Sequence, residues 1–184
     1  MMLRTLIPAL ALAFALGAQA ADWQADPAAS SLGFSGAAEG ESFSGTFTRF
    51  TPVIAFDPAD LAASRFEVEI HLASADTKNA DRDDTLRGDD FFAVSRFPSA
   101  TYTATAFRDL GGGRFAADGT LSLRGVEKPV TLEFSWTQEG ASATLDGTAT
   151  VNRLDFDVGG GDWADASTIV HQIGVVTRLS LREK

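Results

Sequence analysis

Residues 66–72, Phe-Glu-Val-Glu-Ile-His-Leu, place an apolar side chain at every second position and a charged or polar side chain between. Residues 130–137, Val-Thr-Leu-Glu-Phe-Ser-Trp-Thr, repeat this pattern. Successive side chains of a β-strand point to opposite faces, so each segment predicts a strand with one buried face and one face in water. The period of two belongs to strands and not to helices. These two segments decide the fold class, which we expect to be all-β.

Shorter runs of the same kind continue on both sides and are separated by Gly, Pro and Asp residues typical of turns. They predict strands near residues 30–38, 42–50, 101–109, 114–123, 141–151 and 169–181. About eight antiparallel strands form a sandwich or a closed barrel, and closure removes exposed strand edges. We therefore expect an eight-stranded antiparallel barrel, whose interior is either filled by side chains or holds one small ligand.

A charged segment, residues 76–98, breaks the alternation. Asn79 predicts the N-cap of a short helix that continues to about Asp89. Asp83 and Arg87 lie four residues apart, a spacing that favours an ion pair on such a helix.

Aromatic residues follow this helix, and a second irregular segment occurs near the end of the chain. Phe91, Phe92 and Phe97 predict a loop that covers one mouth of the barrel. Residues 158–168 contain three consecutive glycines and Trp163, which predicts a flexible segment with one large anchor. It lines either the same mouth or the opposite one.

The first twenty residues have a basic start at Arg4, an apolar run over residues 6–16 and the small-residue site Ala18-Gln19-Ala20. This pattern predicts a secretory signal peptide, residues 1–20, cleaved after Ala20. Its apolar run is shorter than the roughly 20 residues that a membrane-spanning helix needs. We therefore expect export to the periplasm and one barrel domain over residues 21–184.

Composition excludes several classes of function. The chain has no cysteine, which excludes disulfides, thiolate metal sites and a cysteine nucleophile. Its formal net charge is −10, which opposes binding to nucleic acid and to anionic membrane surfaces. Glu67, Glu69 and Glu133 lie on the faces opposite the apolar ones and argue against a barrel embedded in a membrane.

Two Asp-x-Asp sequences begin like calcium-binding loops, at Asp81 and at Asp155. The first has Leu86 where the loop needs glycine and Phe92 where it needs glutamate, and the second has Ala166 at that last position. We therefore expect no metal site and no cofactor.

Motifs for nucleophilic catalysis are also missing. No G-x-S-x-G sequence occurs, and the two histidines, His71 and His171, both lie in strand patterns. His171 falls between Ile169 and Ile173, so it can face a ligand. We therefore expect that the chain has no catalytic residue and is not an enzyme. The alternative is an enzyme or a stress-response factor that acts on a lipid.

Three motifs carry a family resemblance: Asp76-Thr77-Lys78-Asn79-Ala80-Asp81-Arg82-Asp83 with its continuation to Tyr102, residues 119–130, and Asn152-Arg153-Leu154-Asp155-Phe156. With them the chain resembles the YceI-like family of exported lipid-binding, or polyisoprenoid-binding, proteins. The resemblance spans essentially all of residues 21–184. It implies an extended lipocalin-like barrel with a short helix at one mouth, which holds a long isoprenoid or fatty chain in its apolar interior.

Residues 161–165, Gly-Asp-Trp-Ala-Asp, resemble the branch of that family found beside or fused to cytochrome b-type membrane proteins. This implies an isoprenoid quinone as a ligand and such a membrane protein as a partner. The chain departs from many relatives at His171-Gln172, where a Gly-Asp turn is common, so we expect its last strand to begin differently. A dimer stays open.

We therefore predict a periplasmic lipid carrier, with cargo held by apolar contacts and by cations at the mouth. Each buried methylene contributes about 0.8 kcal/mol, so a tail binds tightly without directional chemistry. Arg82, Arg87 and Arg96 are the nearest cations for an anionic head group, although Arg82 and Arg87 can instead pair with neighbouring aspartates. The predicted ligand contacts are Phe34, Phe47, Arg82, Leu86, Arg87, Phe91, Phe92, Phe97, Tyr102, Phe134, Trp136, Phe156, Trp163 and His171.

Overall fold

The computed structural model describes residues 20–184, so the predicted signal peptide lies outside the described residues except for Ala20. More than half of the described residues lie in strands. These are β1 (Asp22–Ala25), β2 (Ser31–Ala38), β3 (Glu41–Phe47), β4 (Phe50–Ala55), β5 (Arg65–His71), β6 (Ala75–Asp76), β7 (Ser99–Gly111), β8 (Arg114–Leu123), β9 (Val126–Glu139), β10 (Ser142–Asn152) and β11 (Gln172–Glu183). The helices are α1 (Ala80–Arg87) and three short 3₁₀ helices, η1 (Leu72–Ser74), η2 (Arg153–Phe156) and η3 (Gly161–Trp163).

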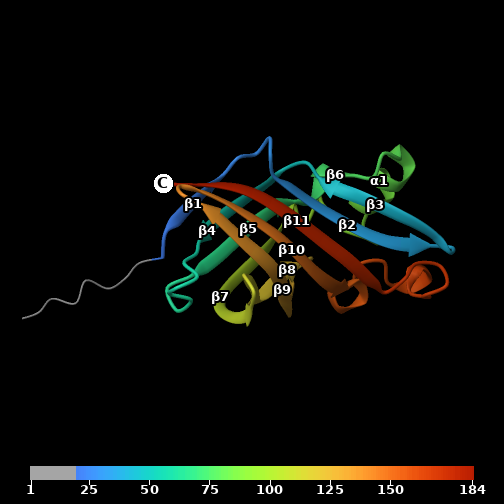
Figure 1. The fold of residues 1–184 in the computed structure, drawn as a ribbon. Coiled ribbons are helices and arrows are strands. Elements are labelled where there is room, and N and C mark those ends of the chain that lie inside the picture. Colours follow the sequence, from blue (N-terminus) through green and yellow to red (C-terminus); the bar gives the residue numbers. More distant parts are fainter. Residues whose placement is uncertain (1–19) are drawn as a thin grey trace, which may run out of the picture.

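Eight strands close into a barrel in the order β1, β4, β5, β7, β8, β9, β10 and β11, and β11 returns to β1 (Figure 1). Neighbouring strands in this ring are antiparallel. Trp23 closes the ring, because it is paired with Glu183 of β11 and with Ile54 of β4. The expected eight-stranded antiparallel barrel is confirmed.

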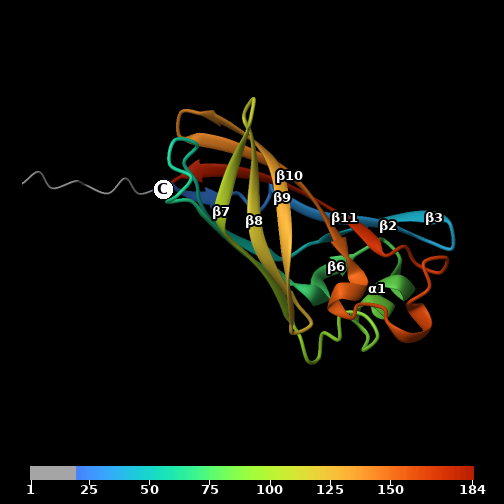
Figure 2. The ribbon, with the colours of Figure 1, turned by 90° about the horizontal axis from the view of Figure 1, so that it is seen from below.

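The β2–β3 hairpin extends the barrel wall beyond this ring. β11 pairs with β1 over Leu181–Glu183, and with β2 over Gly174–Arg178. β3 then pairs with β2, and with β6 at Thr46 and Phe47. The barrel is therefore elongated, and the hairpin tip lies at the end opposite the C-terminus (Figures 1 and 2).

Most strand predictions agree with the structure to within two or three residues, but that for residues 42–50 is wrong. The chain bends between Phe47, which ends β3, and Phe50, which begins β4. Backbone N–H groups at residues 48–49 donate to the carbonyl and hydroxyl oxygens of Ser74 (3.1 Å each). Ser74 therefore holds the bend that separates the two strands.

The last strand begins at Gln172 and not at residue 169. The carbonyls of Ile169 and Val170 accept hydrogen bonds from the Arg153 side chain. The His171 carbonyl accepts a bond from the Arg153 backbone. These bonds hold residues 169–171 outside most of the strand ladder.

One end of the barrel is packed with aromatic side chains. Phe56 is fully buried there, and five aromatic rings have centroids 4.8 to 5.8 Å from its own. The Trp23 indole N–H donates to the Phe56 carbonyl (3.0 Å). We call this cluster the plug; it consists of Trp23, Phe56, Phe66, Phe107, Phe115, Phe134 and Trp136 together with the aliphatic residues around them.

Helix α1 begins where the sequence predicts. The Asn79 side chain accepts the Arg82 backbone N–H (3.0 Å) and caps the helix. The predicted Asp83–Arg87 ion pair is wrong, because Asp83 is buried and accepts hydrogen bonds from Thr77, while Arg87 pairs with Asp84 (2.9 Å). Among residues 20–184, no helix is long and apolar enough to cross a membrane.

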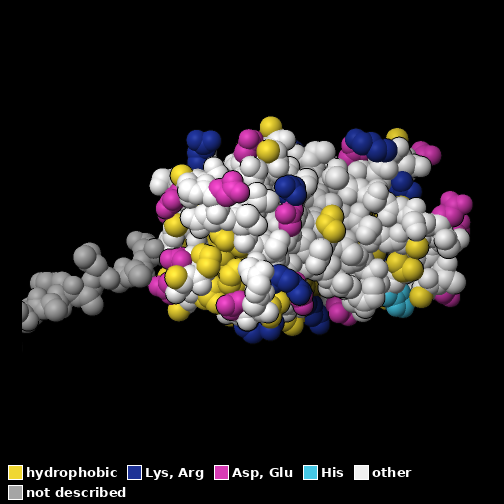
Figure 3. Space-filling view, viewed as in Figure 1, with side chains coloured by type: hydrophobic (Ala, Val, Ile, Leu, Met, Phe, Trp, Pro, Cys, Tyr) yellow, Lys and Arg dark blue, Asp and Glu magenta, His cyan; other side chains and the backbone are white. Residues whose placement is uncertain are grey.

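The outer face of the barrel carries charged side chains. Glu67, Glu69 and Glu133 are all exposed. Acidic and basic side chains are interspersed over the face seen in Figure 3. Several of them form exposed ion pairs across neighbouring strands, including Arg114 with Glu133 (2.9 Å).

Candidate ligand-binding cavity

The half of the barrel beyond the plug encloses a cavity of about 500 Å³. This volume lies within the roughly 300–1,000 Å³ typical of ligand pockets. Its wall consists almost entirely of apolar side chains from nine strands and from the segments around α1 and η3. An apolar cavity of this shape favours a hydrocarbon ligand, since it offers few hydrogen-bonding partners.

Eight of the predicted contact residues line the cavity. Phe34 and Phe47 pack against each other on β2 and β3, with ring centroids 5.1 Å apart. The ring centroid of Phe92 lies 6.0 Å from that of Phe47, so Phe92 continues this aromatic surface. The eight are Phe34, Phe47, Arg82, Leu86, Phe91, Phe92, Tyr102 and Trp163.

Three further predicted residues are buried but do not line the cavity. Phe134 and Trp136 belong to the plug. Phe156, in η2, is buried in the second apolar cluster together with Phe91 and Val158. It therefore supports the cavity wall from behind.

The last three are partly buried and do not line the cavity. Arg87 donates to the carbonyls of Ala73 (3.2 Å) and Ala75 (3.4 Å). Phe97 packs beside Gly125, where an added Cβ would lie 3.1 Å from its ring. The His171 ring nitrogen Nε2 lies 2.8 Å from the Ala164 carbonyl, which can only accept, so Nε2 carries the proton.

Two segments cover the same mouth, which answers a question that the sequence left open. We call them the helix segment, residues 76–98, and the glycine segment, residues 153–170; they lie side by side in Figure 2. The Gly159 backbone N–H donates to the Asp90 carbonyl (2.7 Å). The rings of Phe91 and Trp163 meet edge to face at 5.4 Å. The two segments therefore form one joint cover.

Arg153 organises the glycine segment and was missed by the sequence reasoning. It lines the cavity, is only 4% exposed and directs all five of its N–H donors to backbone carbonyls. Within residues 20–184 no carboxylate oxygen lies within 4.0 Å of it, and burial lowers the pKa of its guanidinium. The five acceptors are the carbonyls of Val158 (3.0 Å), Gly159, Trp163 (2.6 Å), Ile169 (2.9 Å) and Val170 (3.1 Å).

Tyr102 gives the cavity wall a measurable probe, because it is the single tyrosine of the chain. Its hydroxyl lies 2.8 Å from the Ala117 carbonyl and 3.1 Å from that of Val130. Burial raises the pKa of this phenol well above its ordinary value. We expect no phenolate absorbance near pH 10 in the folded chain, whereas the urea-unfolded chain titrates at about pH 10.

The sign of the pH effect follows from this difference. The folded chain retains the Tyr102 proton above pH 10 while the unfolded chain loses it. The contribution of Tyr102 to stability is therefore complete below about pH 10 and declines as the pH rises above it. A phenolate midpoint near pH 10 with an intact circular dichroism spectrum would contradict this account of Tyr102.

Comparisons with known proteins agree with the barrel described above. A model of the YceI-like domain matches residues 23–181. A UPF0312 protein of Vibrio parahaemolyticus is 35% identical over 159 residues, which are 82% of this chain and 84% of that protein. The crystal structure of Burkholderia cenocepacia BcnA matches with a TM-score of 0.82 at 29% identity, over 85% of this chain and 99% of that one. A polyisoprenoid binding domain from Saccharophagus degradans, implicated in plant cell wall breakdown, shares the fold at a TM-score of 0.69 and 17% identity, over 90% and 100% of the two chains.

Proposed function

The chain belongs to the YceI-like domain family, and from this premise we propose that it is a periplasmic carrier of a long-chain apolar lipid, such as a polyisoprenoid or an isoprenoid quinone. The observation that carries the proposal is the apolar cavity of about 500 Å³ beside the plug. A prenyl tail in such a cavity gains about 4 kcal/mol for each buried five-carbon isoprene unit. The polyisoprenoid binding domain that shares this fold supports the same class of ligand.

The cellular setting that we propose rests on two pieces of sequence. Residues 1–20 have the pattern of a signal peptide, which supports export to the periplasm. Residues 161–165 resemble the branch associated with cytochrome b-type membrane proteins. Trp163, within this stretch, lines the cavity at its mouth, where a membrane-bound partner would meet the lipid.

Binding is favoured over catalysis by the few ionisable groups of the cavity. These are Glu39, Arg82, Tyr102 and Arg153 among the lining residues. Arg153 uses all its donors on carbonyls, and the pKa of Tyr102 is raised far from neutrality. His171, the residue that an enzyme acting on the lipid would employ, bonds to a backbone carbonyl outside the cavity wall.

Filling the cavity should abolish lipid carriage. Ala149 of β10 lines the cavity, so Ala149→Phe places an aromatic ring in the space that a tail would occupy. We expect wild-type protein from its native host to yield about one lipid per chain on extraction with organic solvent and mass spectrometry. The variant should retain about one tenth of that amount or less, since overpacking an occupied site excludes the ligand.

Thr150→Phe is the matched control, because the neighbouring side chain on β10 is exposed on the outer face. It should retain the wild-type amount of lipid. The carrier proposal is wrong if mild preparations of the wild type contain no stoichiometric lipid. It is also wrong if the Ala149→Phe protein contains as much lipid as the wild type.

A further inference from the structure

Three elements surround the mouth of the cavity: the β2–β3 hairpin, the glycine segment and the helix segment. Hydrogen bonds cross two of the three boundaries between them. The β2–β3 hairpin is joined to the glycine segment by the Glu39 N–H to the Thr168 carbonyl (2.9 Å) and the Val170 N–H to the Ala37 carbonyl (3.0 Å). The glycine segment is joined to the helix segment at Asp90. The third boundary lies between β3 of the hairpin and α1 of the helix segment.

At this third boundary, no backbone hydrogen bond among residues 20–184 joins Glu41–Gly45 of β3 to α1. β6 pairs with β3 at Thr46 and Phe47, so the part of β3 from Glu41 to Gly45 has a strand neighbour on one edge alone. Phe43 of β3 and Arg82 of α1 face each other there, with the guanidinium carbon 5.6 Å from the ring centroid. Both line the cavity, as does the exposed Thr85. We call this junction of Phe43, Arg82 and Thr85 at the cavity wall the slot.

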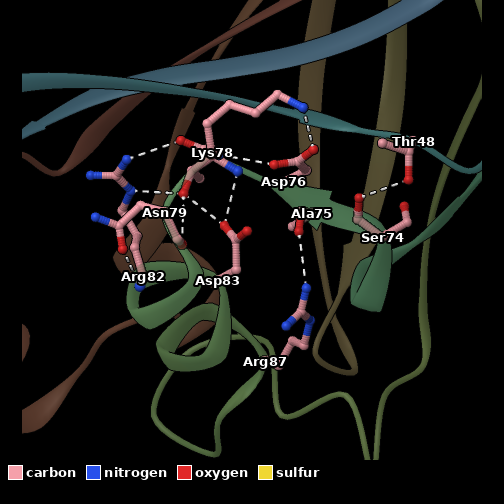
Figure 4. Close-up of polar contacts among 10 residues, drawn as sticks. Thr48, Ser74, Ala75, Asp76, Lys78, Asn79, Arg82, Asp83 and Arg87 are labelled. Atoms are coloured by element: carbon pink, nitrogen blue, oxygen red, sulfur yellow. Dashed lines mark hydrogen bonds and ion pairs between the residues drawn. The ribbon is translucent and has the colours of Figure 1, made fainter.

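Arg82 is held in place by a relay of hydrogen bonds that runs through Thr77 to Asp83, and Figure 4 labels the two ends of this relay. Its Nε–H donates to the Thr77 hydroxyl (2.9 Å), and its Nη2 donates to the Thr77 carbonyl (3.1 Å). The Thr77 hydroxyl in turn donates to the Asp83 carboxylate (2.6 Å), which also accepts the Thr77 backbone N–H (2.9 Å). Thr77 and Asp83 are 5% and 8% exposed, so the relay fixes the orientation of the guanidinium.

The Nη1 group of Arg82 has no acceptor within residues 20–184, and no carboxylate there lies within 4.0 Å of the side chain. The neighbouring cations differ. Arg87 pairs with Asp84 (2.9 Å), Arg96 with Asp89 (3.7 Å) and Lys78 with Asp76 (2.6 Å). Arg82 thus combines a fixed position at the cavity with donors that the described part of the protein does not use.

We propose that Arg82 selects the head group of the lipid, binding an anionic oxygen of a phosphate or carboxylate at the slot while the apolar tail lies in the cavity. This inference rests on the proposed function and, of the ligands named there, favours a polyisoprenoid phosphate over a quinone, whose head group is neutral. An ionised phosphate or carboxylate oxygen forms an ion pair with the guanidinium as well as hydrogen bonds, whereas an alcohol offers hydrogen bonds alone and gains less. Glu39 is the acidic side chain among the residues that line the cavity, and it is exposed, so solvent screening weakens its repulsion of an anion.

Two ligands with the same tail test the proposal: geranylgeranyl phosphate and geranylgeraniol, titrated calorimetrically into the full chain. We expect the wild type to bind the phosphate at least about tenfold more tightly than the alcohol. Arg82→Met should reduce this preference to within about twofold while leaving affinity for the alcohol nearly unchanged. Arg96→Met, which removes an exposed cation that does not line the cavity, should keep the full preference.

Thr77→Val tests the relay, because it keeps Arg82 and removes the hydroxyl that positions it; we expect a reduced but not abolished preference for the phosphate. A phosphate preference that survives in Arg82→Met overturns the assignment. So does an equal loss of affinity for both ligands, since Arg82 would then act by packing against Phe43. If neither lipid binds the wild type, the proposed function fails as well.

Discussion

Replacing Phe56 with alanine should lower the free energy of unfolding by about 3–5 kcal/mol, the usual cost of truncating a buried phenylalanine. Phe56 is fully buried at the centre of the plug, and its ring contacts aromatic side chains from β5, β7, β8 and β9. These rings are locked together, so the surrounding structure can collapse only partly into the space left behind. Urea unfolding followed by tryptophan fluorescence measures the loss, because Trp23 and Trp136 belong to the plug.

Val53→Ala is the matched control for this experiment. Val53 lies three residues earlier, in β4, and is 41% exposed, so its truncation should change stability by no more than about 0.5 kcal/mol. A Phe56→Ala protein that unfolds at the wild-type urea concentration would show that the plug does not hold the barrel together.

The sequence predicts those parts of the fold whose causes are local. Alternation over residues 66–72 and 130–137 identifies β5 and β9 because one face of each strand is buried or half-buried over these residues. Asn79 identifies the start of α1 because capping depends on a residue three positions away. β1, β4 and β6 escaped prediction, β4 except for its first residue, Phe50. β1 and β6 have four and two residues and form only through partners far along the chain.

The candidate cavity could be predicted only in part. Alternation indicates whether a side chain points into a barrel, but not how far along the axis it lies. Phe34 and Phe134 both point inward, yet Phe34 lines the cavity and Phe134 belongs to the plug. The position of each residue along the barrel axis depends on the stagger between neighbouring strands. This stagger is set by the closure of the whole ring.

Charged residues were the hardest to place from sequence. The spacing of Asp83 and Arg87 fits an ion pair on an isolated helix, but Thr77 lies just before the helix and occupies the Asp83 carboxylate. Arg153 has acceptors that are backbone carbonyls, and every residue has one of these. No pattern of side chains could therefore reveal its role.

Replacing Arg153 with methionine should cost about 3–5 kcal/mol of stability and disorder the glycine segment. Methionine keeps part of the volume but supplies no donor, so five carbonyls that now accept from Arg153 lose their partner. A buried carbonyl without a donor costs about 1–3 kcal/mol, and several of these five will regain partners only by turning toward water. The segment should therefore leave the mouth of the barrel.

Hydrogen exchange over residues 158–170 measures this directly, with unfolding in urea for the total stability. Arg178→Met is the control: its exposed pair with Asp146 (3.0 Å) is worth at most about 1 kcal/mol. The stability and the hydrogen exchange of Arg153→Lys should lie between those of the wild type and of Arg153→Met, because an ammonium group has three donors where the guanidinium has five. Wild-type exchange over residues 158–170 in the Arg153→Met protein would mean that Trp163 and Asp90 hold the cover without Arg153. Increased exchange in this segment alone would instead identify Arg153 as the residue that shapes the mouth through which a lipid enters.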